Sequence, residues 1–243
     1  MTTFLADVRR TLVPGADERH GPLPPLLVGL TVVTGLVDAF SYLVLGHVFV
    51  ANMTGNVVFL GFALAGAPGF SITASLSALA AFWVGALIGG AVSSRRAGHR
   101  GRLLASATGL QVVLCAVAVL LAVLAGSDVG AAYRYPLIGL LAVAMGLQNA
   151  AARRLSVPDL TTTVLTLTIT GTAADSAVAG GKGSSAGRRT ISVGSMFAGA
   201  LVGALLVVHV RIYLALVAAL AVLVAVALVA ATSLRSQAPW VRP

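Results

Sequence analysis

The chain has 243 residues, of which 58% are hydrophobic and only 9% are charged. Soluble domains carry about 25% charged residues, so this chain cannot cover its surface with solvated side chains. Its mean hydropathy of +0.98 agrees. The composition indicates an integral membrane protein and excludes a soluble enzyme, a nucleic-acid-binding domain and a disordered protein. The single cysteine, Cys115, excludes an intrachain disulfide and a cysteine-based metal site.

The net charge of +9 comes from sixteen Lys and Arg residues, which fall almost entirely in short gaps between apolar runs. They form no stripe along one helix and have no interleaved aromatic residues, as a nucleic-acid-binding surface would. Short cytoplasmic loops of membrane proteins, by contrast, collect Lys and Arg. We therefore interpret the charge as a signal of topology and expect the lipid bilayer, not nucleic acid, as the partner.

In chain order, residues 1–24 form a polar N-terminal tail, residues 25–233 a single transmembrane domain, and residues 234–243 a polar C-terminal tail. A membrane-spanning helix needs about 20 mostly apolar residues, and six segments of the chain meet that requirement. They are 25–46, 70–94, 103–126, 135–152, 190–209 and 212–233.

Two further segments are long enough to span but are unusually polar. Residues 47–66 contain Asn52-Met-Thr54-Gly55-Asn56, and residues 158–178 open with Pro158-Asp159 and continue through seven threonines. If both segments return to the side they entered from, and the N-terminus is cytoplasmic, fourteen Lys and Arg lie inside and two outside. The split is nine to seven if both span, and ten to six if only the second does. Because positive residues favour the inside, the sequence predicts six spans, two re-entrant or broken segments, and cytoplasmic termini.

The chain also contains an internal repeat, with repeat one at about 25–126 and repeat two at about 135–233. Three matches occur in the same order at nearly constant offset, although coincidence in an Ala-, Gly- and Leu-rich chain is the alternative. Three crossings per repeat turn the second copy upside down relative to the first, an architecture that recurs in transporters. The matches are Gly35–Ala39 with Gly146–Ala150, Met53–Gly55 with Leu165–Leu167, and Gly85–Gly89 with Gly199–Gly203.

Asp38 is an acidic residue deep inside an unambiguous span, roughly 20 Å past Pro25 at 1.5 Å per residue. A central charge costs at least about 2.5–3.5 kcal/mol on insertion scales, so such residues usually face a cavity and have a function. Asp38 is therefore the candidate for proton coupling or cation binding. The alternative is a protonated carboxyl that is bonded to its repeat mate Asn149, to Ser41 or to Thr34.

Unpaired backbone groups cannot lie in hydrocarbon, so broken segments occur only where protein or a water-filled cavity surrounds them. Their polar residues are the candidates to line a transport path, with hydrogen bonding between helices as the alternative role. The small-residue patterns at Gly85, Gly89, Gly199 and Gly203 are typical of packing faces, through which we expect a homo-oligomer. The candidate path residues are Asp38, Asn52, Thr54, Gly55, Asn56, Gln148, Asn149, Asp159, Thr162, Thr163 and Thr166.

Three motifs carry a family resemblance. They are Gly35-Leu-Val-Asp38-Ala, Phe49-Val-Ala-Asn-Met-Thr-Gly-Asn56, and Gly146-Leu-Gln-Asn149-Ala with its continuation to Pro158-Asp-Leu-Thr-Thr-Thr163. Together they resemble the YoaK-like family of small bacterial inner-membrane proteins, which carry a domain of unknown function, over about residues 25–232. The second copy departs from the motif, with Thr166-Leu167 where Thr-Gly would echo the first. The resemblance implies several helices in a bacterial inner membrane and implies no substrate.

These features predict a small secondary transporter or channel-like permease for an unidentified small solute. We expect no cofactor, no metal and no enzymatic activity, because the sequence has neither a catalytic constellation nor a nucleotide-binding motif. The alternative is a non-transporting membrane scaffold or assembly partner, in which the same glycines and threonines serve only packing. A solvent-connected cavity at Asp38 would favour transport, and a filled core there would favour the scaffold.

Overall fold

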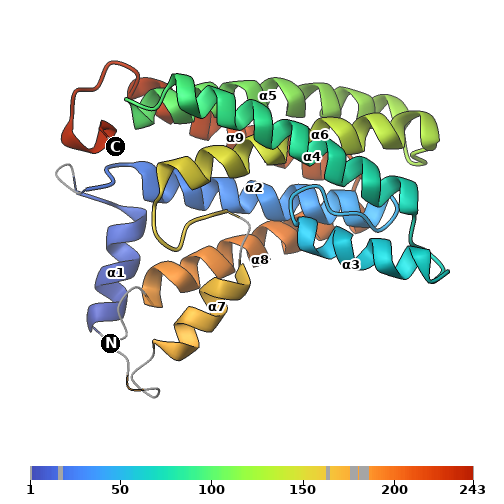
Figure 1. The fold of residues 1–243 in the computed structure, drawn as a ribbon, viewed down its shortest axis with the longest axis horizontal. Coiled ribbons are helices and arrows are strands. Elements are labelled where there is room, and N and C mark those ends of the chain that lie inside the picture. The colour runs from blue at the N-terminus through green and yellow to red at the C-terminus, as the bar shows by residue number, and fades with distance from the viewer. Residues whose placement is uncertain (1, 16–18, 163–164, 176–179, 181–185, 243) are drawn as a thin grey trace.

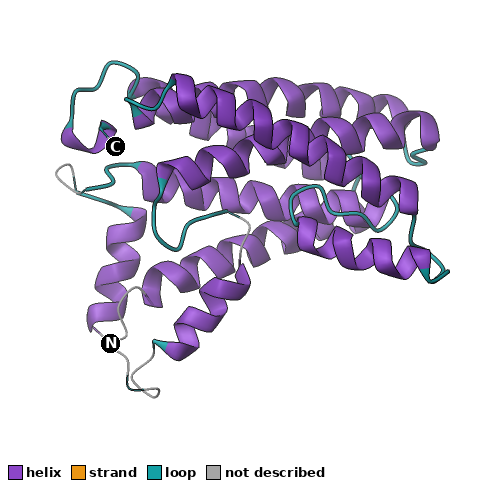
Figure 2. Cartoon of the chain, in the orientation of Figure 1, coloured by secondary structure: helices purple, strands orange, loops and turns teal. Residues whose placement is uncertain are grey.

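The computed structural model describes every residue except 1, 16–18, 163–164, 176–179, 181–185 and 243. Figure 2 shows helices joined by loops, with no strand among the described residues. Six helices are long and apolar enough to cross a membrane, one for each predicted span, so the all-α membrane fold is confirmed. They are α2 (Leu23–Val44), α4 (Ile72–Arg95), α5 (Arg100–Ala125), α6 (Ala131–Leu155), α8 (Ala186–His209) and α9 (Leu214–Thr232).

The two polar segments contain shorter helices, α3 (Met53–Leu64) and α7 (Leu165–Ala174). At 1.5 Å per residue they are about 18 and 15 Å long, well short of the ~30 Å hydrocarbon core. Non-helical chain precedes each of them, at 45–52 and 156–162. Figure 1 shows α3 toward one end of the long helices and α7 toward the other end. Both segments are therefore broken, as the sequence predicted.

Glycines let the long helices cross at close range, with α2 packed on α8 and α4 packed on α6. A Cβ atom on Gly85 would lie 2.1 Å from the carbonyl oxygen of Val143, and one on Gly199 would lie 2.2 Å from that of Val32. The two contacts correspond to each other, because the glycines are 114 residues apart and the valines 111.

Gly89 and Gly203 make matching contacts about one turn further along, against Leu147 and Leu36 respectively. The small-residue patterns thus face neighbours within the same chain, and their glycines are buried. A homo-oligomer stays a prediction and would need a different surface from Gly85, Gly89, Gly199 and Gly203.

The outer helices present apolar side chains to their surroundings. α2 and α6 are the most buried of the six long helices, whereas α4, α5, α8 and α9 are more exposed. Trp83 on α4 and Phe197 on α8, 114 residues apart, each expose 67% of their surface. Exposed apolar surface around a helical bundle is what lipid covers, in agreement with a multi-pass membrane protein.

The two polar tails also contain short helices. α1 (Thr2–Leu12) packs on α8, where Asp7 Oδ2 accepts the backbone N–H of Arg188 at 2.9 Å. The Asp7 carboxylate thus lies against the first turn of α8, where the helix dipole favours negative charge. At the other terminus, the 3₁₀ helix η2 (Pro239–Val241) packs near α5. Its Trp240 ring covers Gly21, where a Cβ atom would lie 2.5 Å from the ring, and the φ of +47° at Gly21 also favours glycine.

Candidate functional site

Asp38 holds the non-helical chain that precedes α3. Its Oδ1 accepts the backbone N–H groups of Val50 at 3.1 Å and of Ala51 at 2.9 Å, and its Oδ2 accepts the side-chain amide of Asn52. The Asp38 side chain lies in the interior, with 4% of the residue exposed. Buried polar groups need hydrogen-bond partners, and here the carboxylate and the unwound backbone satisfy each other.

The partners that the sequence suggested for Asp38 bind elsewhere. Ser41 Oγ donates to the backbone carbonyl of Asp38 at 3.2 Å, not to its carboxylate. Thr34 Oγ1 and the Asn149 side-chain amide each donate to a backbone carbonyl of their own helix at 3.0 Å. The Asp38–Asn52 pairing joins residues 14 apart through a non-helical stretch, so no helical period in the sequence could reveal it.

Gly55 and Asn56 shape the turn into α3. Asn56 Oδ1 accepts the backbone N–H of Phe49 at 2.9 Å, and Asn56 Nδ2 donates to the Phe49 carbonyl at 2.5 Å. The Phe49 ring packs over Gly55, where a Cβ atom would come within 2.6 Å of the ring. The structure places both residues in the turn into α3, and their predicted role in lining a path stays a prediction.

A cavity of about 420 Å³ lies between the starts of α3 and α7, against α4, α6 and α8. Four of the predicted path residues line it together. Asn52 and Thr54 come from the first broken segment, Thr166 from the second, and Asn149 from α6. The two polar segments, more than 100 residues apart in the chain, therefore meet at one site.

Corresponding residues of the two halves face this cavity. Thr54 and Thr166 are 112 residues apart, and Phe82 and Met196 are 114 apart. Sequence reasoning missed Phe82 and Met196, because an apolar residue on a spanning helix gives no sign of facing a cavity. The repeat register could have found them, since each stands three residues before the first glycine of a small-residue pattern.

A second pocket, of about 330 Å³ and largely apolar, adjoins Asp38 between α2 and α8. Tyr42 and Phe49 are among its lining residues. Asn52 lines both cavities, so the Asp38–Asn52 hydrogen bond lies at their boundary. Asp38 is therefore one of the residues that line this open pocket, although only 4% of the residue is exposed.

Gln148 lies outside these cavities. It is 1% exposed, its Oε1 accepts Gln111 Nε2 at 2.6 Å, and its Nε2 donates to Thr34 Oγ1 at 2.9 Å. These bonds connect α6 with α5 and α2 in the centre of the bundle. Gln148 was predicted to line the path, and the structure places it in a hydrogen-bond network between helices.

The remaining predicted residues follow α6. Asp159 Oδ1 forms an ion pair with Arg189 Nε at 2.9 Å, and Arg189 Nη1 also binds Asp175. Thr162 is 1% exposed, has a φ of +66°, and its hydroxyl has no partner within the described residues. Thr163 lies outside the described residues. No three His, Cys, Asp or Glu side chains gather as metal ligands in the part of the chain that the structure describes.

The model of the family described as "Protein of unknown function (DUF1275)" matches residues 26–229. This range includes both broken segments and the residues that line the cavity between them. The chain belongs to the DUF1275 family. The resemblance drawn from the three motifs is thereby confirmed.

A curated relative is the UPF0700 transmembrane protein YoaK of Bacillus subtilis (strain 168), which is 36% identical over 146 residues. The match covers 59% of this chain and 63% of YoaK, so it spans less than two thirds of that relative's length. No solved structure matches the chain. Membership of DUF1275 fixes the family of this membrane protein and leaves its activity to be argued from the site.

Proposed function

We propose that this DUF1275 protein is a small secondary transporter or channel-like permease for a small solute. Its path runs through the cavity between α3 and α7. The observation that carries the proposal is that this cavity lies where two broken helices begin and is lined from both halves of the chain. Transporters bind their substrates at discontinuous helices near the bilayer midplane, between structural repeats. The proposal includes no enzymatic step and no cofactor.

Two inverted repeats, α2–α5 and α6–α9, place this cavity at their interface. The helix pairing supports them: α2 packs on α8 as α6 packs on α4, and α5 packs on α6 as α9 packs on α2. The corresponding glycine contacts of Gly85 and Gly199 support the same relation. With three spanning helices in each repeat, the second repeat has the opposite orientation in the membrane.

The cavity lining favours a polar or anionic group on the solute. α3 begins at Met53, and the first turn of a helix presents unpaired N–H groups and the positive end of the helix dipole. Met53 and Thr54, both in that turn, line the cavity. The Asn149 amide and the Thr166 hydroxyl add neutral donors and acceptors. The volume of about 420 Å³ falls within the range of small-molecule sites.

Asp38 is the proposed site of proton coupling. If Asp38 gains a proton on Oδ2, that oxygen becomes a donor and a weaker acceptor for the Asn52 amide, and the Asn52 side-chain oxygen becomes its better partner. Asn52 would then turn, and because it lines the cavity, the wall beside the solute would change. Ionisable residues within spanning helices usually take part in such pathways.

We place the protein in a bacterial cytoplasmic membrane with both termini in the cytoplasm. The distribution of charge supports this orientation, because it puts fourteen of the sixteen Lys and Arg residues inside. Arg134 and Arg211 are the two outside.

Reconstitution tests the proposal. Purified protein in liposomes should take up at least one member of a panel of small metabolites, assayed with and without a pH gradient. Thr54→Phe fills the cavity and should lower this uptake about tenfold or more. Val57→Phe is the matched control, because Val57 lies on the same helix and is 60% exposed. Asp38→Asn should abolish the dependence of uptake on the pH gradient.

Full uptake by Thr54→Phe would remove the cavity from the path, and an unchanged pH dependence in Asp38→Asn would remove the coupling role. The alternative function, a non-transporting scaffold, has one observation in its favour. Gly55, Asn56 and Gln148 are all engaged within the chain. The scaffold predicts no uptake of any metabolite by the native protein.

A further inference from the structure

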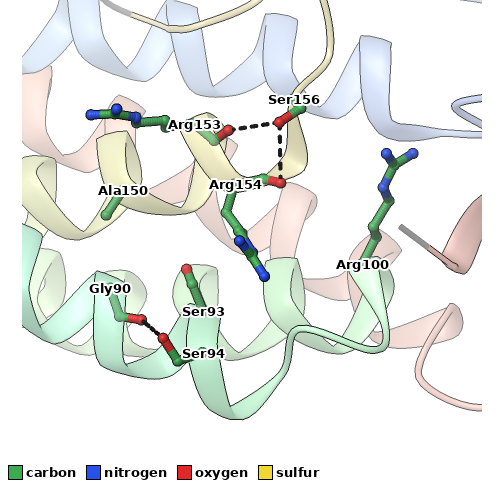
Figure 3. A pocket seen from close by; sticks show the side chains of 8 residues that line it. All are labelled: Gly90, Ser93, Ser94, Arg100, Ala150, Arg153, Arg154 and Ser156. Atoms are coloured by element: carbon green, nitrogen blue, oxygen red, sulfur yellow. Dashed lines mark hydrogen bonds between the residues drawn. The ribbon is translucent and has the colours of Figure 1, made fainter.

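A cavity of about 640 Å³ lies where α4 ends, α5 begins and α6 ends. Figure 3 shows the side chains that line it, among them three arginines and three serines. In this view Arg154 extends from α6 toward α4 and lies between Ser93 and Arg100, while Arg153 extends along α6. The cavity is separate from the proposed transport path and shares no lining residue with it.

Donors in this cavity lack acceptors. Ser93 is 4% exposed, and its hydroxyl has no hydrogen-bond partner among the described residues; the buried Nε of Arg100 is unpaired in the same sense. The ion pairs within the described residues belong to Arg189, so no described carboxylate neutralises Arg153 or Arg154. Leaving a buried donor unpaired costs about 1–3 kcal/mol, and a bound anion would remove that cost.

Two further serines do not compete for such an anion. Ser94 Oγ donates to the carbonyl of Gly90 at 3.0 Å, and Ser156 Oγ donates to that of Arg153 at 3.0 Å, as the dashed lines in Figure 3 mark. Their hydroxyls are satisfied by the helix ends. Ser93 and the arginines are left as the polar groups that face the open volume.

The fold itself does not require arginines at these positions. At the offset of 111, Arg153 and Arg154 correspond to Tyr42 and Leu43, which line the second, apolar pocket beside Asp38. That pocket holds the equivalent place between α2 and α8 and has no arginine in its lining. The basic lining is therefore a property of one end of the molecule alone. The positive-inside rule accounts for arginines in this loop region. It does not account for the cavity or for the buried Ser93 hydroxyl beside them, because a charge that only sets the topology needs neither.

We propose that this cavity binds a phosphate group, through the guanidinium groups of Arg100 and Arg154 and the hydroxyl of Ser93. Arginine presents a planar set of donors that matches phosphate in two-point fashion, and basic pockets between transmembrane helices bind lipid head groups. The phosphate group belongs either to an anionic phospholipid or to a small soluble anion, and the two sources share the same contacts. The site does not depend on the proposed transport function.

Binding measurements on the purified full chain test the site and separate the two sources. One arm measures retention of phosphatidylglycerol over phosphatidylcholine in mixed nanodiscs by native mass spectrometry. The other measures binding of inorganic phosphate and pyrophosphate in neutral detergent by calorimetry. Arg100→Gln with Arg154→Gln should weaken the binding seen in either arm about tenfold or more. Arg95→Gln with Arg96→Gln removes the same charge from exposed residues near the same helix end, and should change binding less than about twofold.

Ser93→Leu fills the cavity while keeping every arginine, and it should also weaken binding about tenfold, which covers the case of an arginine variant that does not fold. Lipid preference without phosphate binding assigns the site to a head group. Phosphate binding without lipid preference assigns it to a soluble anion. The proposal is overturned if native protein shows neither, or if the Arg95/Arg96 control loses as much binding as the cavity variants.

Discussion

Asp38 and Asn52 form a donor–acceptor pair whose order can be reversed by substitution. Asn52→Asp alone brings two carboxylates together at a site where Asp38 is 4% exposed. We expect this variant to lose at least about 2 kcal/mol of stability, because like charges in the interior lack compensation. Asp38→Asn combined with Asn52→Asp restores one donor opposite one acceptor, and the introduced amide oxygen can still accept the N–H groups of Val50 and Ala51.

The thermal midpoint of each variant in detergent, with gel filtration as the readout of folded protein, measures the change in stability. The double variant should recover most of the midpoint lost by Asn52→Asp, and Asp38→Ala should stay low because two backbone N–H groups lose their acceptor. A double variant as unstable as Asn52→Asp would show that the pair does not hold the chain before α3.

For single residues, the sequence predicts how deep in the membrane a side chain lies better than it predicts which groups that side chain contacts. The hydropathy pattern puts Asp38 inside the membrane, and the internal repeat relates the polar motifs around Thr54 and Thr166. These two threonines do line one cavity. The sequence cannot distinguish a polar side chain that lines a cavity from one that bridges helices. Gln148 is the example, since its partners Gln111 and Thr34 lie on other helices and depend on how distant segments pack.

Helix crossings are where the two halves should respond alike to substitution. Gly85→Ala and Gly199→Ala each place a Cβ atom at about 2 Å from a backbone carbonyl oxygen of the facing helix. Backbone cannot yield as a side chain can, so we expect each variant to lose about 1–3 kcal/mol or more. The two losses should be similar, because the contacts correspond. Thermal midpoints in detergent provide the comparison.

Gly90 and Gly194 lie on the same two helices and supply the control. A Cβ atom added at either position meets no atom within 4 Å. Alanine there should leave stability unchanged or raise it by up to about 1 kcal/mol through helix propensity. Losses at Gly90→Ala equal to those at Gly85→Ala would mean that close crossing is not the reason for the glycines.

For whole elements, the sequence predicts that a spanning helix is present better than it predicts the residues at which the helix begins and ends. The apolar run predicts a helix at 135–152, whereas α6 extends over Ala131–Leu155. Arg153 and Arg154 continue the helix beyond the apolar stretch, because charged residues at a helix end reach the aqueous boundary and carry no penalty there. A hydropathy window detects the part of a helix that lies in lipid and misses its polar ends.

For the whole molecule, the broken segments and the loop charges make a joint prediction about sidedness. If α3 returns to the side on which α2 ends, residue 68 lies on the side opposite the N-terminus, and residue 127 lies there with it because α4 and α5 both span. Eight spanning helices would instead put residue 68 with the N-terminus. The positive-inside rule favours the first arrangement, in which the loop after α3 is outside the cell.

Accessibility of single cysteines decides between these arrangements. In a Cys115→Ala background, Pro68→Cys and Ser127→Cys should react with a membrane-impermeant thiol reagent in intact cells, since both positions are exposed. Gly98→Cys and Gln237→Cys, also exposed, should react only after permeabilisation. With the N-terminus cytoplasmic, protection of both Pro68→Cys and Ser127→Cys in intact cells, together with a reactive Gly98→Cys, would mean that the first broken segment crosses the membrane. The inversion of the two repeats would fall with it, because an even number of crossings leaves both copies in the same orientation.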